Sequence, residues 1–320
     1  MDNKSNMITP EGLASLKPKT KDPHSINVLN RWVSLAETNL GLAQSGRLSW
    51  LIATTIATAK LQEIVDSAGE SRFLLKGGTL LQHRLAPNSR ATKDLDGIVR
   101  DDIDDFLNHL DEKLEESWGV IEFERSDIEL IEVPNKIIKP RRFELSLLLR
   151  GQTWRKIKVE VSSDEGMTGI KAEKFPAPSL AGFGLPTPDY LVGISMSYQI
   201  AQKIHAATAP HDPPEQVNER ARDLVDLLLL KQLAEEIGSP TIGDIKAATV
   251  DIFETRAKEA EILRRPIRTL PAAIAPHPHW ETDYIAAAKS AGVSAPISEV
   301  TTQVNAWLST LQQPHHPKEK

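Results

Sequence analysis

Apolar residues recur at spacings of three and four between residues 26 and 68, a pattern typical of amphipathic helices. At Arg72 the period changes. The short apolar run RFLLK ends at Gly77-Gly78 and predicts a buried strand that enters a tight turn. We expect Thr79 to cap the helix TLLQHRLA that follows this turn. The segment KDLDGIV then predicts a second strand.

The middle of the chain combines one helical pattern with several alternating ones. Residues 101–118 form an acidic amphipathic pattern and predict a helix. The segments GVIEFERSDIELIEV, RFELSLLLR and WRKIKVEVS then alternate between apolar and polar residues, as half-buried strands do. We expect Gly151-Gln152 to turn the last two strands into a hairpin.

Four prolines follow the predicted strands and indicate a linker. They are Pro176, Pro178, Pro186 and Pro188. Beyond them the pattern is helical, over residues 189–207, 214–237 and 242–260. The sequence therefore predicts an α+β fold in two domains, with helices and a mixed sheet in residues 1–185 and a helical C-terminal domain in residues 186–320.

Composition narrows the classes of function. The chain has 320 residues, no cysteine and a net charge of −6. The lack of cysteine excludes thiol nucleophiles and zinc–thiolate sites. No stretch approaches the roughly 18 apolar residues of a membrane span, and the polar first residues lack the apolar core of a signal peptide. We therefore expect a cytoplasmic protein with no membrane partner.

Charge is distributed unevenly along the chain. Residues 101–116 are strongly acidic, whereas residues 139–158 are basic, with Glu144 as their single acidic residue. The basic residues of this stretch are Lys139, Arg141, Arg142, Arg150, Arg155, Lys156 and Lys158. Such a patch on an acidic protein can bind a phosphate backbone. The alternative is two solvated surfaces of opposite sign.

The first chemical motif is Lys76-Gly77-Gly78-Thr79. Two glycines after a strand let the backbone approach a ligand closely, and the helix that follows presents free N–H groups. This combination predicts an anion site that suits the triphosphate of an NTP.

The second motif is the pair Asp94 and Asp96, whose side chains share one face of the predicted strand. Two adjacent carboxylates repel each other unless a cation lies between them, and Mg²⁺ is the natural one. Glu160 on a neighbouring strand would complete a site for two Mg²⁺ ions. A second D-x-D, Asp102 and Asp104, begins the acidic helix, where the helix dipole favours carboxylates without any catalytic role.

A further group lies in the helical part of the chain. Lys203 lies on the flank of an apolar helix, from which its ammonium can reach a cleft. Asp223 and Asp226 lie on one face of a later helix. Taken alone, these features are typical of a lysine whose stem packs and of an ion-paired helix.

The order of these motifs resembles the AbiEii/AbiGii toxin family, to which the MenT toxins are similar. The matching segments are LLKGGT, R-x-T-x-DLD, KVEV, QKIHA and RARDLVDL, between about Phe73 and Leu230. The resemblance implies a polymerase-β-like nucleotidyltransferase fold followed by a helical domain. The catalytic positions it implies are Gly78, Thr79, Asp94, Asp96, Lys203 and Asp223. The chain departs from the family at Gly97, where an aromatic residue is frequent.

The resemblance also implies roles for these residues. Asp94 and Asp96 would hold Mg²⁺ against the triphosphate, and Glu160 would help to lower the barrier to deprotonating an acceptor hydroxyl. Lys76, Gly77, Gly78 and Thr79 would bind phosphate oxygens. Lys203 would neutralise the leaving pyrophosphate, and Asp223 would orient Lys203 or Arg222. The expected reaction is in-line attack on the α-phosphorus of the NTP.

The resemblance further implies an RNA acceptor, in particular the 3′ end of tRNA, and a cognate antitoxin. Arg264, Arg265 and Arg268 join the basic stretch as candidate RNA contacts. Thr92 is a candidate regulatory site, because its phosphorylation by a kinase-like antitoxin would add negative charge beside Asp94. Its other reading is a threonine that favours a strand.

Two alternatives remain open from the residues alone. A nucleotidyltransferase that modifies a small molecule, such as an antibiotic or a sugar phosphate, shares the same motifs. A non-catalytic nucleotide- or RNA-binding module would keep the fold without the reaction. The histidines at 277, 279, 315 and 316 lie in proline-broken segments without a paired ligand set, so we do not expect a metal site there.

Overall fold

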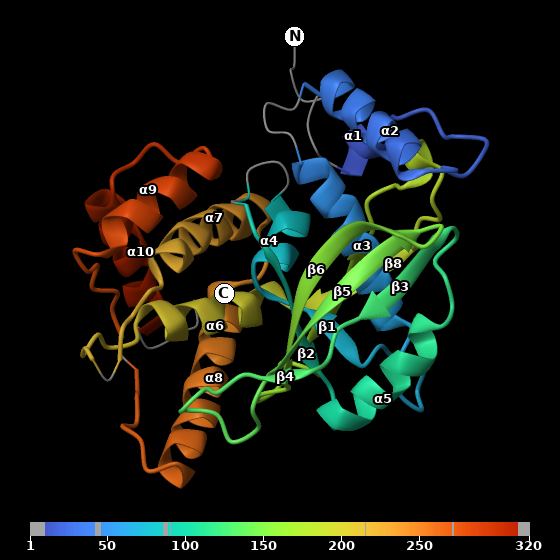
Figure 1. Ribbon diagram of the computed structural model, residues 1–320. Coiled ribbons are helices and arrows are strands. Elements are labelled where there is room, and N and C mark those ends of the chain that lie inside the picture. The colour runs from blue at the N-terminus through green and yellow to red at the C-terminus, as the bar shows by residue number, and fades with distance from the viewer. Residues whose placement is uncertain are drawn as a thin grey trace, which may run out of the picture.

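The computed structural model describes residues 10–41, 46–85, 89, 91–214, 216–270 and 272–312. Its elements form two groups that lie side by side (Figure 1). One group is a sheet with the helices α1 (Pro10–Ala14), α2 (Ile26–Asn39), α3 (Arg47–Gln62) and α5 (Ile103–Leu114). The other group is helical and comprises α6 (Met196–Ala207), α7 (Ala221–Ile237), α8 (Ile242–Ile262), α9 (Trp280–Ser290) and α10 (Ile297–Gln312).

The sheet has eight strands and is mixed. Its strands are β1 (Phe73–Leu75), β2 (Asp94–Val99), β3 (Ile121–Arg125), β4 (Glu129–Leu130), β5 (Arg141–Leu149), β6 (Gln152–Ser163), β7 (Ala172–Pro176) and β8 (Tyr190–Ile194). The order is β3-β5-β6-β2-β1-β8-β7, with β4 paired to β5. Strands β2 and β6 are parallel, as are β1 and β8. The predicted α+β fold with a mixed sheet and C-terminal helices is confirmed.

The predicted hairpin between β5 and β6 is present, but its turn lies one residue earlier than expected, because Gln152 is already paired with Leu149. Its two loop residues, Arg150 and Gly151, both have positive φ, at 53° and 71°. Two-residue hairpin loops favour this conformation because it matches the twist of the strands. The alternation of β6 then turns Ile157, Val159 and Val161 into the core and the polar residues between them to the other face.

Two hydrophobic cores divide the chain, and helix α4 (Gly77–Leu85) lies between them (Figure 1). Leu80 packs in the core of the sheet, whereas its neighbour Leu81 packs among the C-terminal helices. Because α4 is anchored on both sides, the turn at its N-terminus has a fixed position between the two groups.

The helix predicted over residues 189–207 is wrong in its first part. Residues Tyr190–Ile194 form β8, and helix α6 starts only at Met196, with Ser195 as its N-cap. The run YLVGI is too short and too uniformly apolar to reveal its periodicity, and pairing with β1 and β7 decides the outcome. The sheet therefore continues beyond residue 185, and the two cores divide between Ile194 and Met196.

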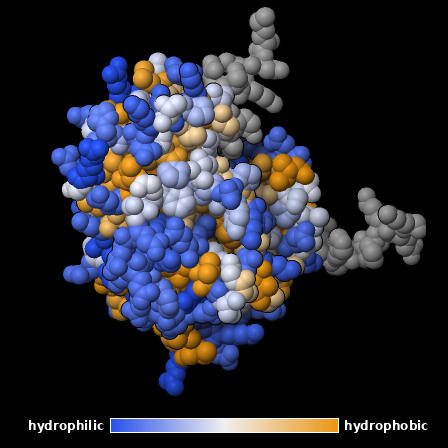
Figure 2. All heavy atoms as spheres, turned by 90° about the vertical axis from the view of Figure 1, so that its right-hand side faces the viewer, coloured by the Kyte–Doolittle hydropathy of each residue, from blue (hydrophilic) through white to orange (hydrophobic). Residues whose placement is uncertain are grey.

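The acidic helix α5 has the predicted orientation. Phe106, Leu107 and Leu110 are buried against the sheet, and the acidic residues point outward. Asp102 caps the helix by accepting a hydrogen bond from the N–H of Asp105 (2.8 Å), so this second D-x-D has a structural role. Figure 2 shows the side of the molecule on the right of Figure 1, where hydrophilic residues dominate and apolar ones form separate groups.

Within the described part of the chain, no helix has both the length and the apolar character needed to span a bilayer.

Candidate functional site

The turn between β1 and α4 is tightly packed against the strand that carries the aspartates. The N–H of Lys76 donates to the carbonyl of Asp96 (2.9 Å). Gly77 has φ +64°, and a Cβ added there would lie 2.2 Å from Oδ2 of Asp96. Only glycine allows this conformation together with so close a carboxylate. The first amides of α4 have no acceptor within the helix and are free to bind an anion.

Thr79 has a different position from the one expected. Helix α4 begins at Gly77, so Thr79 lies inside the helix and is not its N-cap. Its buried hydroxyl donates to the carbonyl of Asp94 (2.8 Å). This bond ties α4 to the start of β2, which positions the first aspartate relative to the glycine turn.

Three carboxylates lie next to one another on the face of the sheet opposite the core. The side chains of Asp94 and Asp96 share one face of β2, and Asp96 is paired in register with Glu160 on the parallel strand β6. Burial raises the pKa of Asp96, and the negative charges of Glu160 and Asp94 add to this effect against the charges of Lys76 and Lys203. Burial therefore disfavours the charged form of Asp96, and a bound cation would offset this cost.

Two basic residues of the same face contact these carboxylates. Nζ of Lys158 lies 2.7 Å from Oδ1 of Asp94. Nε and Nη2 of Arg142 donate to Oε1 of Glu160, at 2.9 and 2.7 Å. Lys76 donates to Oγ of Ser162 (2.6 Å), and burial lowers its pKa against the attraction of Asp96.

Asp94 and Asp96 fit a divalent cation, because they present carboxylate oxygens side by side on one face of β2 and burial leaves the charge of Asp96 poorly solvated. Glu160 is oriented toward Arg142. In the part of the chain that the structure describes, no group of three or more acidic or histidine side chains forms a ready metal site. His315 and His316 lie outside the described residues.

Lys203 of α6 is held by two carboxylates of α7. Its Nζ donates to Oδ1 of Asp223 (2.8 Å) and to Oδ2 of Asp226 (2.6 Å). All three side chains are buried. Asp223 is thus placed to orient Lys203, and Asp226, which the sequence indicated only as a neighbour on the same face, does the same. Arg222 is exposed and lies 3.9 Å from Asp283 of α9, away from this group.

Gln199 connects the two halves of the site and had no signal in the sequence. It lies one helical turn before Lys203 on α6, it is buried, and its Nε2 donates to the carbonyl of Gly77 (3.0 Å). The helix that carries Lys203 therefore contacts the glycine turn directly.

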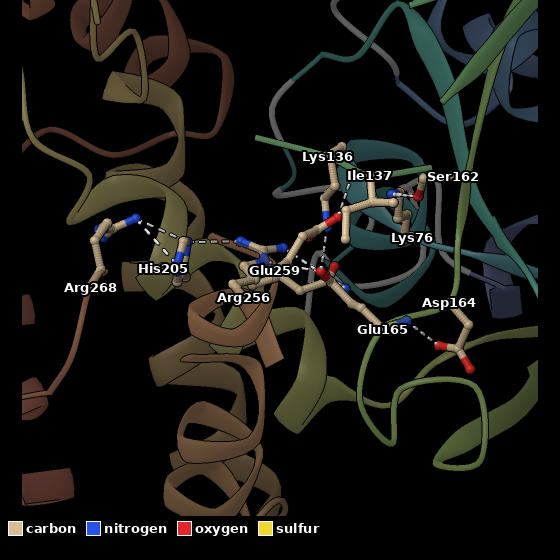
Figure 3. Close-up of polar contacts among 11 residues, drawn as sticks. Lys76, Lys136, Ile137, Ser162, Asp164, Glu165, His205, Arg256, Glu259 and Arg268 are labelled. Atoms are coloured by element: carbon tan, nitrogen blue, oxygen red, sulfur yellow. Dashed lines mark hydrogen bonds and ion pairs between the residues drawn. The ribbon is translucent and has the colours of Figure 1, made fainter. Parts of the chain in front are cut away.

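A second charged cluster joins the helical group to the sheet beside the site (Figure 3). Glu165, which follows β6, accepts hydrogen bonds from Nε and Nη2 of Arg256 (3.0 and 2.6 Å), from Lys136 (3.0 Å) and from Gln202 (2.9 Å). Burial alone raises the pKa of Glu165, but Arg256, Lys136 and Lys76 hold it far below its ordinary value. Lys136 also contacts Glu259 (3.0 Å).

His205 lies at the other end of this cluster (Figure 3). Its Nδ1 lies 2.9 Å from Nη1 of Arg256 and 3.0 Å from Nη1 of Arg268. Burial and the two guanidinium charges lower the pKa of His205 to about 2, so the ring is neutral beside the two arginines. Arg268 also donates to Thr208 (2.8 Å) and is therefore fixed within the protein rather than extended toward solvent.

Two further predicted positions have a clear structural setting. Thr92 precedes β2 instead of lying in it, is half-buried, and its hydroxyl lies 3.4 Å from the carbonyl of Asp94. At Gly97, a Cβ would lie 2.1 Å from the ring of Phe73. The ring of Phe73 thus fills the space beside the strand that a larger residue at 97 would need.

Comparisons with known proteins decide the family. A family model described as the nucleotidyl transferase AbiEii toxin of type IV toxin–antitoxin systems matches residues 60–306. The chain belongs to the AbiEii toxin family. This match confirms the resemblance and extends it beyond 73–230 at both ends. Members of the family are nucleotidyltransferases, so the chain is an enzyme of this class, and the toxin–antitoxin assignment implies an antitoxin partner.

Among the 8 solved chains that match is MenT4, a nucleotidyltransferase toxin from Mycobacterium tuberculosis H37Rv. It is 17% identical, with a TM-score of 0.44, and the match covers 90% of this chain and 99% of that chain. No curated protein matches the chain in sequence.

Gly77→Ala tests the close approach of the turn to Asp96. A methyl group at this position meets the Asp96 carboxylate, in addition to the strain of a positive φ, which costs about 1–2 kcal/mol. We expect loss of nucleotide transfer and a lower free energy of unfolding in urea. Gly151→Ala is the matched control, since its φ is +71° but no atom lies within 4 Å of the added Cβ. Equal activity in the two variants would contradict this packing.

Asp96→Asn tests the cost of burying the charged carboxylate of Asp96. Because the folded protein raises the pKa of Asp96, the ionised carboxylate costs stability above that pKa, and the cost disappears as the pH falls through it. We expect the variant to lose activity and to have a higher Tm than the metal-free parent at pH 8, with a smaller difference at low pH. Asp102→Asn keeps a favourable N-cap residue and should change neither the activity nor the Tm.

Glu165→Gln tests the link between the two groups of elements. A lowered pKa contributes stability above the unfolded value of about 4.3, and this stability is lost as the pH falls toward the folded value. At pH 7 we expect a loss of about 3–5 kcal/mol in the free energy of unfolding. The difference in free energy of unfolding between the variant and the parent should become smaller below a pH of about 4. Glu70→Gln removes an exposed ion pair with Lys174 and should have no measurable effect.

Proposed function

We propose that this protein is a Mg²⁺-dependent nucleotidyltransferase toxin that transfers NMP from an NTP to an RNA acceptor, the 3′ end of tRNA. The observation that carries the proposal is the meeting of three groups at one place. Asp94 and Asp96 lie beside the Gly77 turn, and Gln199 joins that turn to the helix of Lys203. A carboxylate pair, an anion-binding turn and a fixed lysine are the parts that nucleotide transfer requires.

The roles follow from the contacts. Asp94 and Asp96 would hold the divalent cation, and the cation would supply positive charge against the triphosphate. The amides of Gly77 and Gly78 bind phosphate oxygens, and Lys76 lies next to them. Thr79 acts through the backbone of Asp94 rather than on the nucleotide. A second cation would need Glu160 as a further ligand, and Glu160 would first have to leave Arg142.

The reaction joins the acceptor to the nucleotide in one displacement. A hydroxyl oxygen of the acceptor attacks the α-phosphorus of the NTP, and its proton passes to a carboxylate of the site or to water. The bond from the α-phosphorus to the oxygen that bridges to the β-phosphorus breaks, and pyrophosphate leaves with that electron pair. Lys203, which Asp223 and Asp226 fix in place, stabilises the developing charge.

The sheet offers a surface for the acceptor beside the carboxylates. Arg142, Lys156 and Lys158 lie on the same face as Asp94 and Asp96. Arg141 lies on the opposite side of β5, where it pairs with Asp104 of α5 at 3.0 Å, so it does not belong to this surface. Arg264 and Arg265 are exposed beyond α8. The choice of tRNA rests on the family, whose members act as toxins.

Transfer of label tests this function. Purified protein is incubated with Mg²⁺, total tRNA and each α-labelled NTP in turn, beside Asp94→Ala. We expect label in tRNA with one preferred nucleotide, and a loss of at least roughly a hundredfold in the variant, because the cation loses a ligand. Periodate oxidation of the tRNA 3′ end should block the reaction.

Other outcomes of this assay have definite meanings. NTP binding without label in RNA would contradict the RNA acceptor and favour a small-molecule acceptor. The absence of Mg²⁺-dependent NTP binding would contradict the enzyme site itself and favour a non-catalytic binding module.

We also propose that the cognate antitoxin is kinase-like and silences the toxin by phosphorylating Thr92. This side chain lies next to the backbone of Asp94 and is partly accessible. A phosphate group adds nearly two negative charges beside carboxylates that already repel each other.

Thr92→Glu tests this mode of regulation. We expect transfer activity to fall roughly tenfold or more, because the added carboxylate repels the triphosphate. Thr92→Gln, which is equally large but neutral, should retain most of the activity. Full activity of Thr92→Glu in the labelling assay would contradict the proposal.

A further inference from the structure

The cations on the outer face of the sheet are arranged in rows with the catalytic carboxylates. Across β5, β6 and β2, the register places Arg142 beside Glu160 and Glu160 beside Asp96. The next row is Glu144, Lys158 and Asp94. Each row therefore sets a basic side chain next to a carboxylate that faces the proposed metal site.

The contact between Lys158 and Asp94 is close but has poor hydrogen-bond geometry. The ammonium lies 2.7 Å from Oδ1, yet this oxygen is shielded from solvent and accepts no aligned hydrogen bond from the described residues. A contact of this kind is held by charge alone. A second cation that binds Asp94 would therefore displace Lys158 readily.

Exposure determines which cations of the site can change partner. The side chains of Lys158 and Asp94 are 47% and 37% exposed, so their ion pair contributes little stability and is readily broken. Lys203 is 9% exposed and its partner Asp226 is fully buried. Removing a partner from a buried group of this kind is strongly unfavourable. Lys203 is therefore fixed, whereas Lys158 can be exchanged.

We infer that Lys158 is an exchangeable counter-ion of Asp94, which it leaves for a phosphodiester of the acceptor RNA when a divalent cation binds at Asp94. This inference rests on the proposed function. The long stem of lysine lets the ammonium swing across the open face of β6. Lys158 thereby couples the two ligands, because metal binding frees a cation for the RNA, and RNA that holds Lys158 leaves Asp94 to the metal. Such coupling is reciprocal.

Lys156 provides a matched control. It is two residues away on the same face of β6, it is similarly exposed at 57%, and it pairs with Glu144 at 2.5 Å instead of a carboxylate of the site. Lys158→Met and Lys156→Met each remove one positive charge from the same surface. Only Lys158→Met removes the positive charge that contacts Asp94.

The experiment measures binding rather than activity. Mn²⁺ affinity is measured by electron paramagnetic resonance in the absence of nucleotide, and affinity for fluorescein-labelled tRNA is measured with and without Mn²⁺ at constant ionic strength. Lys158→Met should bind Mn²⁺ roughly threefold to tenfold more tightly than the parent, because a competing cation is gone. It should bind tRNA more weakly, and Mn²⁺ should no longer strengthen that binding. Lys156→Met should leave the Mn²⁺ affinity and the strengthening by Mn²⁺ unchanged.

The outcomes separate this inference from the proposed function. Mn²⁺ binding that is equal or weaker in Lys158→Met would overturn the inference, and so would strengthening by Mn²⁺ that persists in this variant. If Lys158→Met does not fold, Lys158→Gln replaces it with the same expectations. If Asp94→Ala and the parent bind Mn²⁺ alike, the metal site itself is absent, and both the proposed function and the inference fail.

Discussion

The contact between Gly77 and the carboxylate of Asp96 is the constraint on which the site depends. It requires a residue without Cβ at positive φ, a strand β2 pressed against β1, and a helix α4 that begins directly at the turn. Helix α4 cannot shift to relieve this contact, because two of its adjacent residues, Leu80 and Leu81, are buried in different hydrophobic cores. The close approach of the anion-binding turn to the carboxylate is therefore enforced by packing on both sides.

The charges around this contact fall into two kinds. Lys203 is buried with its two partners, Asp223 and Asp226. The cluster of Glu165 with Arg256 and Lys136 is only slightly more exposed. The ion pairs of Glu165 fix the helical part of the chain against the sheet, whereas those of Lys203 join α6 to α7 within the helical part. Asp94, Glu160, Arg142 and Lys158 lie on an open face of the sheet, where ion pairs contribute little stability. A rigid frame thus surrounds a set of charges that can change partner when ligands bind.

The sequence predicts the elements that depend on local patterns. The alternation of β6, the acidic helix and the hairpin at Arg150-Gly151 follow from periodicity and turn chemistry. The run YLVGI was misread as helix, because four or five apolar residues have no visible period and a partner strand far away in sequence decides their state. Thr79 is not the cap because the helix starts two residues earlier, at Gly77. Glycine and threonine are similarly favoured at helix N-termini, so the local pattern does not fix the start.

Some residues of the candidate site can likewise be predicted from the local sequence, whereas others depend on long-range contacts. The shared face of Asp94 and Asp96 follows from the two-residue period of a strand, and the family motif indicates Lys203 and Asp223. Glu160 lies beside Asp96 because β2 and β6, which are far apart in sequence, pair in parallel, and local patterns do not predict this pairing. Glu165 and Gln199 have partners on distant elements, Arg256 on α8 and Gly77 at the start of α4. The local sequence around Glu165 and Gln199 contains no motif that predicts these long-range contacts.

The central claim is that the Gly77 turn and the two aspartates of β2 bind one metal–triphosphate complex. The most direct test is a crystal structure with Mn²⁺ and a non-hydrolysable NTP analogue, in which anomalous scattering locates the ion. The account predicts an anomalous peak bound by Asp94 and Asp96, with the triphosphate at the amides of Gly77 and Gly78. A peak elsewhere, or a triphosphate bound away from the turn, would contradict it.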